Sequence, residues 1–219
     1  MSHTTWTPMI FIVSAPSGAG KTTLCDKLQA EFKNLHYAIT ATTRPSREGE
    51  VNGKHYYFLT EDEFERRLKS GDFFETAVVH GYRYGSPKSP VIEALRAGRD
   101  VLMNLDVQGA AVIRKCVAAA PPGDPLHREL VDIFVVPPSL ETLKKRLVKR
   151  GKDTDETIER RLKQAKEEIS HWQEYKYKVV NDDLAEAYDN MRAIILAERH
   201  KTRNRADDEA ETRNLKPET

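Results

Sequence analysis

Cysteine is scarce in this chain, with two among 219 residues. Cys25 and Cys116 have no metal-ligand spacing, which argues against a zinc site, and both fall in predicted helices as free thiols of a reducing compartment. Long apolar runs are also missing, because none approaches the ~20 residues of a membrane span. Residues 1–8 lack the apolar centre of a signal peptide. These absences predict a soluble, cytoplasmic protein without a membrane contact.

An excess of charge of one sign is absent as well. Lys and Arg number 35 against 34 Asp and Glu, a net charge of +1. This balance argues against bulk nucleic-acid binding, although local basic clusters can still bind phosphates. The length suits one domain with insertions and allows a sizeable buried core.

The most informative stretch is residues 9–23. Its first five residues are apolar, with β-branched members, and predict a strand buried on both faces. Gly18 and Gly20 then allow the backbone to turn its N–H groups inward at the start of a helix, which makes an anion site. Lys21 can reach the β- and γ-phosphates, and the Thr22 hydroxyl can face Mg²⁺, largely through water. This order favours a nucleoside triphosphate site over a plain glycine turn.

The loop departs from the usual G-x-x-x-x-G-K-[ST] pattern at one position, because Ala15 stands where the first glycine is expected. The predicted nucleoside triphosphate-binding loop, which the resemblance described below assigns to ATP, comprises Ala15, Pro16, Ser17, Gly18, Ala19, Gly20, Lys21, Thr22 and Thr23.

Strand and helix patterns alternate on both sides of a distinct middle segment. Strands are expected at 9–13, 35–40, 100–105, 131–136 and 177–180, and helices at 21–33, 89–97, 107–119, 139–151, 154–172 and 184–200. Such alternation is typical of a parallel sheet covered on both faces. It predicts an α/β fold with a five-stranded parallel sheet flanked by helices, whose core is 9–39, 89–145 and 166–200.

Residues 40–88 differ in being polar, glycine-punctuated and aromatic. Short strands are expected at 56–59, 73–79 and 82–85, and Thr60 with Glu63 forms a capping box for a helix to about Ser70. The segment is too long for a loop of ~12–15 residues, so it predicts an inserted mixed α+β subdomain with a second ligand. Residues 201–219 are charged and poor in large apolar side chains, which predicts a flexible tail.

Several motifs between residues 9 and 199 together resemble the guanylate kinase family. They are APSGAGKT (15–22), TTRPSREGE (42–50), YYF (56–58), FE (74–75), YGS (84–86), DVQGA (106–110) and VND (180–182). The resemblance implies a P-loop nucleoside monophosphate kinase domain over 9–200, with a GMP-binding insertion at 40–88 and a helical lid at 146–165. It implies transfer of the γ-phosphate of ATP to GMP, giving ADP and GDP, with Mg²⁺, in purine nucleotide metabolism. No nucleic acid and no obligate protein partner is expected.

A phosphate monoester on the second substrate needs charge neutralisation, which arginine supplies bidentately. Arg44 and Arg47 lie three apart in a turn-rich segment, and Tyr56 and Tyr84 can add hydroxyl donors. The resemblance assigns these four to the GMP phosphate, with Arg44 also counted as catalytic. The alternative is that the arginines pair with glutamates of the same segment and that the tyrosines are half-buried core.

A carboxylate accepts two parallel hydrogen bonds, and guanine offers N1–H and N2–H₂ in that arrangement, whereas adenine presents a bare acceptor at N1. The resemblance makes Glu75 the guanine reader, with Ser86 and Thr40 donating to O6 or nearby. An exposed strand carboxylate is the alternative for Glu75.

The end of the strand at 100–105 is expected beside the glycine loop. The resemblance places Asp106 there to orient Mg²⁺ and its waters. The family pattern is Asp-x-Asp, and this chain has Asn104 at the first position, where an amide can bind substrate or water but cannot neutralise charge.

Phosphoryl transfer draws on positioning and positive charge. Arg146, Arg150 and Arg161 flank Gly151 where two helices meet. The resemblance assigns Arg150 and Arg161 to the phosphates, Arg146 to the ATP side and Asn181 to adenine. A solvated basic helix face is the alternative for the arginines.

Two other functions stay open. One is a guanylate-kinase-like module that has lost catalysis and binds phosphorylated partners, and the other is a kinase for another phosphate-bearing acceptor such as AMP, UMP or a sugar phosphate. An intact glycine loop with Lys21 argues against the first, and Glu75 with Ser86 argues against AMP.

Overall fold

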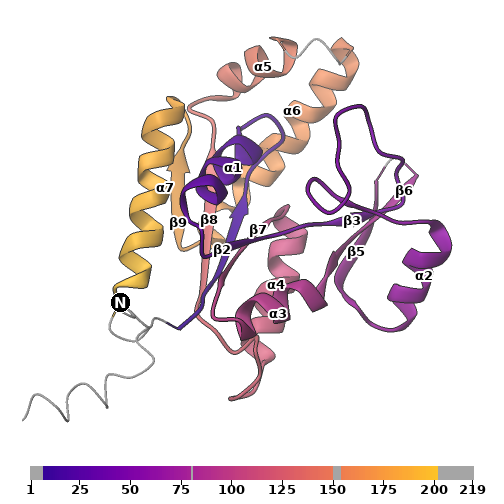
Figure 1. Ribbon diagram of the computed structural model, residues 1–219. Coiled ribbons are helices and arrows are strands. Elements are labelled where there is room, and N and C mark those ends of the chain that lie inside the picture. Colours follow the sequence, from indigo (N-terminus) through magenta and orange to yellow (C-terminus); the bar gives the residue numbers. More distant parts are fainter. Residues whose placement is uncertain (1–6, 80, 150–153, 202–219) are drawn as a thin grey trace, which may run out of the picture.

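The computed structural model describes residues 7–79, 81–149 and 154–201. Its main sheet has five strands in the order β2-β7-β1-β8-β9 (Figure 1). All neighbouring pairs are parallel, as expected. The strands are β1 (Ile10–Ser14), β2 (Leu35–Ala38), β7 (Asp100–Asn104), β8 (Leu130–Val136) and β9 (Tyr177–Val180). The sheet order places β1, which leads into the glycine loop, at its centre.

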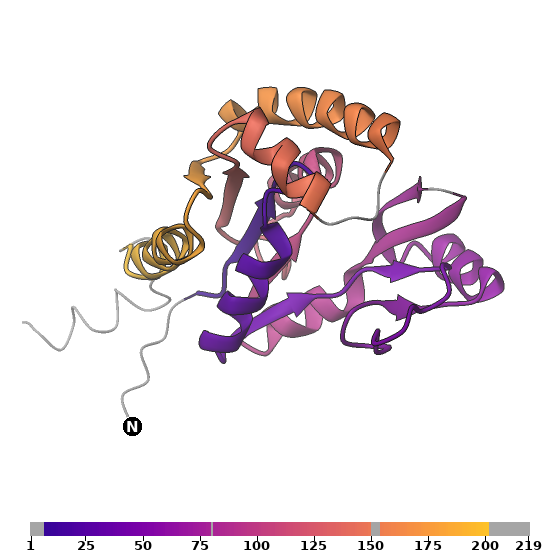
Figure 2. The same cartoon turned by 90° about the horizontal axis from the view of Figure 1, so that it is seen from above.

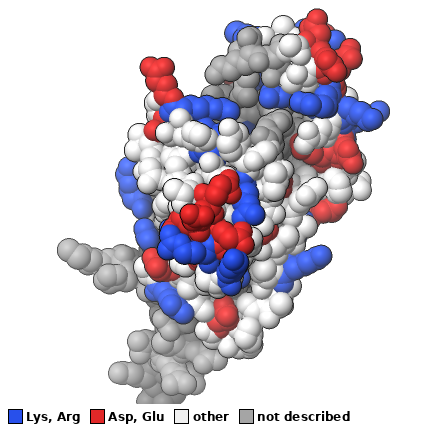
Figure 3. Space-filling view, turned by 90° about the vertical axis from the view of Figure 1, so that its right-hand side faces the viewer, with Lys and Arg blue, Asp and Glu red and all other residues white. Residues whose placement is uncertain are grey.

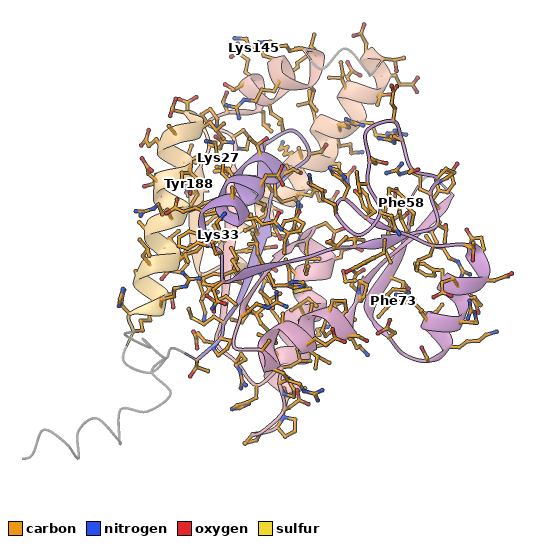
Figure 4. The ribbon with its side chains drawn as sticks, viewed as in Figure 1. Lys27, Lys33, Phe58, Phe73, Lys145 and Tyr188 are labelled. Atoms are coloured by element: carbon orange, nitrogen blue, oxygen red, sulfur yellow. The ribbon has the colours of Figure 1, made fainter. Side chains whose placement is uncertain are left out.

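Helices cover both faces of this sheet because alternate side chains of β1 point to opposite sides. Phe11 and Val13 pack under α1 (Lys21–Glu31) and α7 (Leu184–Arg199). Ile10 and Ile12 pack against α3 (Lys88–Arg96) and α4 (Val107–Ala119). Every residue of β1 is buried, so the predicted two-sided burial is confirmed. Figure 4 shows Lys27 of α1 beside Tyr188 of α7, with the ammonium 5.3 Å from the ring centroid.

A second, four-stranded sheet of order β4-β3-β6-β5 lies to one side of the first (Figures 1 and 2). Its strands are β3 (Ala41–Thr42), β4 (Tyr57–Phe58), β5 (Phe73–Val79) and β6 (Tyr82–Pro87), and α2 (Glu61–Lys69) packs on it. The predicted cap of α2 is present, since the Thr60 hydroxyl accepts from the Glu63 N–H at 3.2 Å. The rings of Phe64 and Phe73 stack with centroids 4.6 Å apart. The short strand β3 was not anticipated from the sequence.

The helices α5 (Leu140–Lys149) and α6 (Asp155–Ser170) lie over the carboxyl end of β1 (Figures 1 and 2). They share a small apolar cluster that contains Leu143, Leu147, Ile158 and Ala165. The helix expected to reach residue 172 ends earlier, because residues 171–174 form a separate 3₁₀ turn, η1 (His171–Glu174).

Charged side chains of both signs are interspersed on the face of the molecule shown in Figure 3. Around α2 they form ion pairs, such as Arg67 Nε with Glu63 Oε1 at 2.9 Å and Arg83 Nη1 with Glu65 Oε2 at 2.5 Å. Both cysteines are free thiols. Within the described ranges, none of the helices is long and apolar enough to cross a membrane.

Candidate active site

The loop after β1 has the backbone shape that its glycines predict. Gly18 and Gly20 have φ values of +94° and +92°, in the left-handed region that side chains disfavour. Gly20 is the residue before the first turn of α1, and no side chain caps that turn. Ala15 is buried, whereas Thr22 and Thr23 are exposed. The loop therefore presents the amino end of a helix to an anion.

The Lys21 ammonium lies between the loop and the end of β7. Its Nζ donates to the backbone carbonyl of Leu105 at 2.7 Å. Burial lowers the pKa of Lys21, and the nearby Cys25, Asp106 and Glu168 act in the opposite direction. The predicted closeness of Asp106 to the glycine loop is thus a feature of the structure, and the Lys21 amino group lies between the two.

Asp106 and Asn104 are both engaged at the end of β7. Asp106 caps α4, because its Oδ1 accepts from the Gly109 N–H at 2.7 Å. The Asn104 Nδ2 donates to the Tyr37 hydroxyl at 2.9 Å. Burial raises the pKa of Tyr37, so that hydroxyl keeps its proton and can donate it onward.

Arg44 is buried, with a relative exposure of 8%, at the start of the insertion. Its Nη2 donates to both oxygens of the Glu50 carboxylate, at 2.8 and 2.9 Å. Hydrogen bonding to Glu50, and to a lesser extent to Tyr84, raises the pKa of Arg44. The alternative expected for Arg44, pairing with a glutamate of its own segment, is therefore part of what the structure contains. This pair also fixes the direction of the guanidinium.

The aromatic side chains around Arg44 complete a small cage. The Arg44 guanidinium lies 5.4 Å from the Tyr56 ring centroid and 5.7 Å from that of Phe58, which Figure 4 labels. Tyr56 and Tyr84 meet edge to face at 6.1 Å. Arg47 belongs to the same turn, with its N–H bound to Glu50 and its side chain exposed. Four of the predicted phosphate-binding residues are thus brought together.

Glu75 and Ser86 face each other across the β5–β6 pair. The Ser86 hydroxyl donates to Glu75 Oε1 at 2.7 Å. Partial burial raises the pKa of Glu75, with a smaller contribution from Asp106 and an opposing one from Ser86. Because Glu75 is half-buried, the alternative of a fully exposed strand carboxylate does not hold. Thr40 and Ser86 also line one small pocket together with Leu105.

The predicted lid arginines are placed differently from one another. Arg146 of α5 donates to the main-chain carbonyls of Asn181 and Asp182 at 2.9 and 3.1 Å. Arg161 is half-buried on α6. Arg150 lies outside the described residues. Asn181 itself is buried, and its Nδ2 donates to the Ala19 carbonyl of the glycine loop at 2.6 Å.

Two residues at the site were missed by sequence reasoning. Tyr37 holds Asn104, and Glu168 lies in electrostatic reach of Lys21. Glu50, which holds Arg44, was expected from the sequence as one of two possible glutamate partners, with Glu48. No local signal marks Tyr37 or Glu168, because the sheet and α6 bring them to the site from distant parts of the chain.

The central parallel sheet carries a glycine loop before α1, and a cage of arginine and tyrosine side chains lies in the insertion. Together these two features define a P-loop nucleotide kinase. The family model for guanylate kinase matches residues 7–198. A guanylate kinase of Maricaulis maris is 47% identical over 193 residues, covering 88% of this chain and 84% of the relative. One of Sphingopyxis alaskensis is 44% identical, with coverage of 89% and 84%.

Among solved structures, the crystal structure of guanylate kinase from Anaplasma phagocytophilum superposes with a TM-score of 0.71. Its sequence is 32% identical, and the match covers 94% of each chain. The chain belongs to the guanylate kinase family. The fold and the enzyme class expected from the sequence are confirmed, and the reading as a non-catalytic binding module gains no support.

Proposed function

We propose that this member of the guanylate kinase family transfers the γ-phosphate of ATP to GMP, giving ADP and GDP, through the residues described above. ATP is its co-substrate. The reaction needs two nucleotides whose phosphates meet in line, held by fixed positive charge and shielded from water. The two halves of the site supply these conditions.

The position of Leu105 is the observation that carries the proposal. Its carbonyl accepts from Lys21 of the glycine loop, and its side chain lines the pocket that contains Thr40 and Ser86. One residue therefore separates the donor phosphate loop from the acceptor pocket. This is the proximity that direct phosphoryl transfer between two bound nucleotides requires.

The acceptor side is assigned to the insertion at 40–88. Arg44, held by Glu50, would bind the GMP phosphate with Arg47, and the hydroxyls of Tyr56 and Tyr84 would donate to the same group. Glu75 would accept from guanine N1–H and N2–H₂, since its carboxylate is half-buried and oriented by Ser86. Asn104 at the end of β7 and Thr40, which follows β2, would also contact the nucleotide.

The donor side is assigned to residues 15–23. The backbone N–H groups of the loop would hold the β-phosphate, and Lys21 would leave the Leu105 carbonyl to neutralise charge on the γ-phosphate. Asn181, which contacts the loop, and Arg146, which contacts Asn181, would lie on the ATP side. Asp106 would orient Mg²⁺ and its waters.

The donor set fits Mg²⁺ as well. Thr22 offers an exposed hydroxyl and Asp106 a carboxylate, which are hard oxygen ligands. The described residues hold no cluster of three or more metal-ligating side chains, so the ion would take most of its ligands from phosphates and water. When bound, it would neutralise charge on the transferring phosphoryl group.

The lid is assigned to residues 146–165. Arg161, together with Arg150, would add positive charge over the phosphates when α5 and α6 close, and closure would exclude water.

The cytoplasm is the compartment that we propose, because both cysteines are free thiols.

The test is the initial rate of ADP formation with ATP, Mg²⁺ and each of GMP, dGMP, AMP, UMP and CMP. We expect GMP to be strongly preferred over AMP, UMP and CMP. ATP binding without turnover of any acceptor would overturn the proposal, and preference for another acceptor would overturn the role of Glu75.

A further inference from the structure

Asn181 makes a contact with the glycine loop that base recognition does not explain. Its N–H donates to the Val136 carbonyl at 2.8 Å, which fixes its backbone to the end of β8. Its side-chain Nδ2 donates to the Ala19 carbonyl at 2.6 Å. A carbonyl can only accept, so the amide nitrogen must face the loop. One of the two N–H groups of this side chain is therefore bound to the protein itself.

The loop is shaped around this amide. A Cβ added to Gly20 would overlap the Asn181 amide nitrogen. The Ala19 carbonyl, one residue before Gly20, is held by this amide from outside the helix. The loop glycine is thus required for the close approach of Asn181 as well as for its left-handed backbone.

The same residue is tied to α5. The Asn181 carbonyl accepts from Arg146 Nη1 at 2.9 Å, and the next carbonyl, that of Asp182, accepts from Nη2 at 3.1 Å. A Cβ on Gly18 would lie 3.0 Å from both Leu143 Cδ1 and Leu147 Cδ2 of this helix. The glycine loop therefore rests on α5 directly through Gly18 and indirectly through Asn181.

We propose that Asn181 is a positioning residue, whose amide clamps the Ala19 carbonyl and so sets the loop's affinity for the phosphates of any donor nucleotide. This role concerns the ATP side of the proposed active site and rests on the proposed function. It differs from a role in reading adenine, because a clamp acts on the polyphosphate whatever base is attached. Buried in the protein, the clamp also links the loop to the base of the proposed lid.

The test compares Asn181→Asp with the wild type. The new carboxylate cannot donate to the Ala19 carbonyl and repels it, so the loop loses its anchor. We expect the KM for ATP and the Kd for inorganic tripolyphosphate both to rise about tenfold. The KM for GMP at saturating ATP should stay unchanged. In Asn181→Ala, which also removes the side-chain oxygen that could accept from the adenine amino group, the ratio of kcat/KM for ATP to that for inosine triphosphate, which carries oxygen in place of that amino group, should stay unchanged.

Two results would overturn the clamp. One is an unchanged tripolyphosphate affinity, and the other is a selective loss of ATP relative to inosine triphosphate in Asn181→Ala, which would place the amide on the base. If Asn181→Asp does not fold, Asn181→Ala removes the donor without adding charge and allows the same comparison. Tripolyphosphate binding needs no GMP turnover, so failure of the clamp is distinguishable from failure of the GMP kinase reaction, which appears in the wild-type assay alone.

Asn34→Asp is the matched control. The Asn34 Nδ2 also donates to a backbone carbonyl, that of Gly98, at 3.1 Å, but at the amino end of β2. This exchange removes the same kind of bond from the other end of the sheet. We expect a lower melting temperature at most, with KM values and tripolyphosphate affinity unchanged. An equal loss of affinity in this control would also overturn a specific role for Asn181.

Discussion

At the residue scale, Glu75 combines a structural cost with a functional use. Partial burial penalises its charged form and raises its pKa, although the Ser86 hydroxyl partly offsets this. The folded chain consequently holds the Glu75 proton more tightly than the unfolded chain does. As pH rises from the unfolded pKa through the raised folded value, folding becomes less favourable.

Glu75→Gln tests this directly. The amide is nearly isosteric and uncharged, so the free energy of unfolding at neutral pH should be unchanged or higher. For GMP, one of the two acceptor positions becomes a donor, and kcat/KM should fall by about 10- to 100-fold. Steady-state kinetics together with urea unfolding measure both quantities. Undiminished use of GMP in a folded variant would contradict the assignment.

The same shift predicts a pH dependence. Below its raised pKa, Glu75 becomes protonated and loses an acceptor for guanine, at pH values where an ordinary glutamate of pKa about 4.3 is still charged. The kcat/KM for GMP should therefore fall on acidification before the kcat/KM for ATP does. In Glu75→Gln this difference between the two pH profiles should disappear, and its persistence would assign the titration to another group.

At the element scale, Asp106 has two separable tasks. It caps α4 through the Gly109 N–H, and it stands beside Lys21 at the end of β7. Capping needs an oxygen acceptor, which asparagine also provides, whereas the orientation of a cation and its waters needs the negative charge. Capping of α4 and orientation of a cation thus place different demands on the Asp106 side chain.

Asp106→Asn and Asp106→Ala separate these tasks. The asparagine variant should keep its stability and lose at least about tenfold in kcat, because the carboxylate charge is gone. The alanine variant should lose a similar factor in kcat. Its free energy of unfolding should also fall by about 1 kcal/mol, because the cap is lost. Chemical denaturation and single-turnover kinetics provide the comparison. Equal stability of the two variants would refute the capping role.

At the scale of the whole molecule, a buried ion pair joins the two ends of the main domain. Asp100 at the start of β7 is fully buried and accepts from the Met9 N–H at 2.9 Å. Its other oxygen lies 2.6 Å from Arg199 Nη2, at the end of α7. The Arg199 guanidinium stacks over Phe32 at 4.8 Å. The pair holds the last helix against the amino-terminal end of β7, which is remote from the glycine loop.

Arg199→Ala should leave a buried carboxylate without its cation and lower the free energy of unfolding by about 3–5 kcal/mol. The KM values of the folded fraction should not change. Arg192→Ala is the control, because Arg192 pairs with Glu31 on the exposed side of the same helix, and such surface pairs contribute far less. Equal losses in the two variants by urea denaturation would contradict a special role for the buried pair.

The local patterns of the chain were sufficient to predict the strand–loop–helix at residues 9–23, the five parallel strands and the Thr60 cap, since each depends on neighbours within a few positions. They also indicated the chemistry of Arg44, Glu75 and Asp106. The Arg44 pair with Glu50, six positions apart, is also local. Tertiary structure alone decided the contacts between distant residues, because the Tyr37 contact of Asn104 and the Asn181 clamp on Ala19 depend on sheet order and long-range packing. Partners that lie 67 or 162 positions apart leave no periodic trace in a sequence.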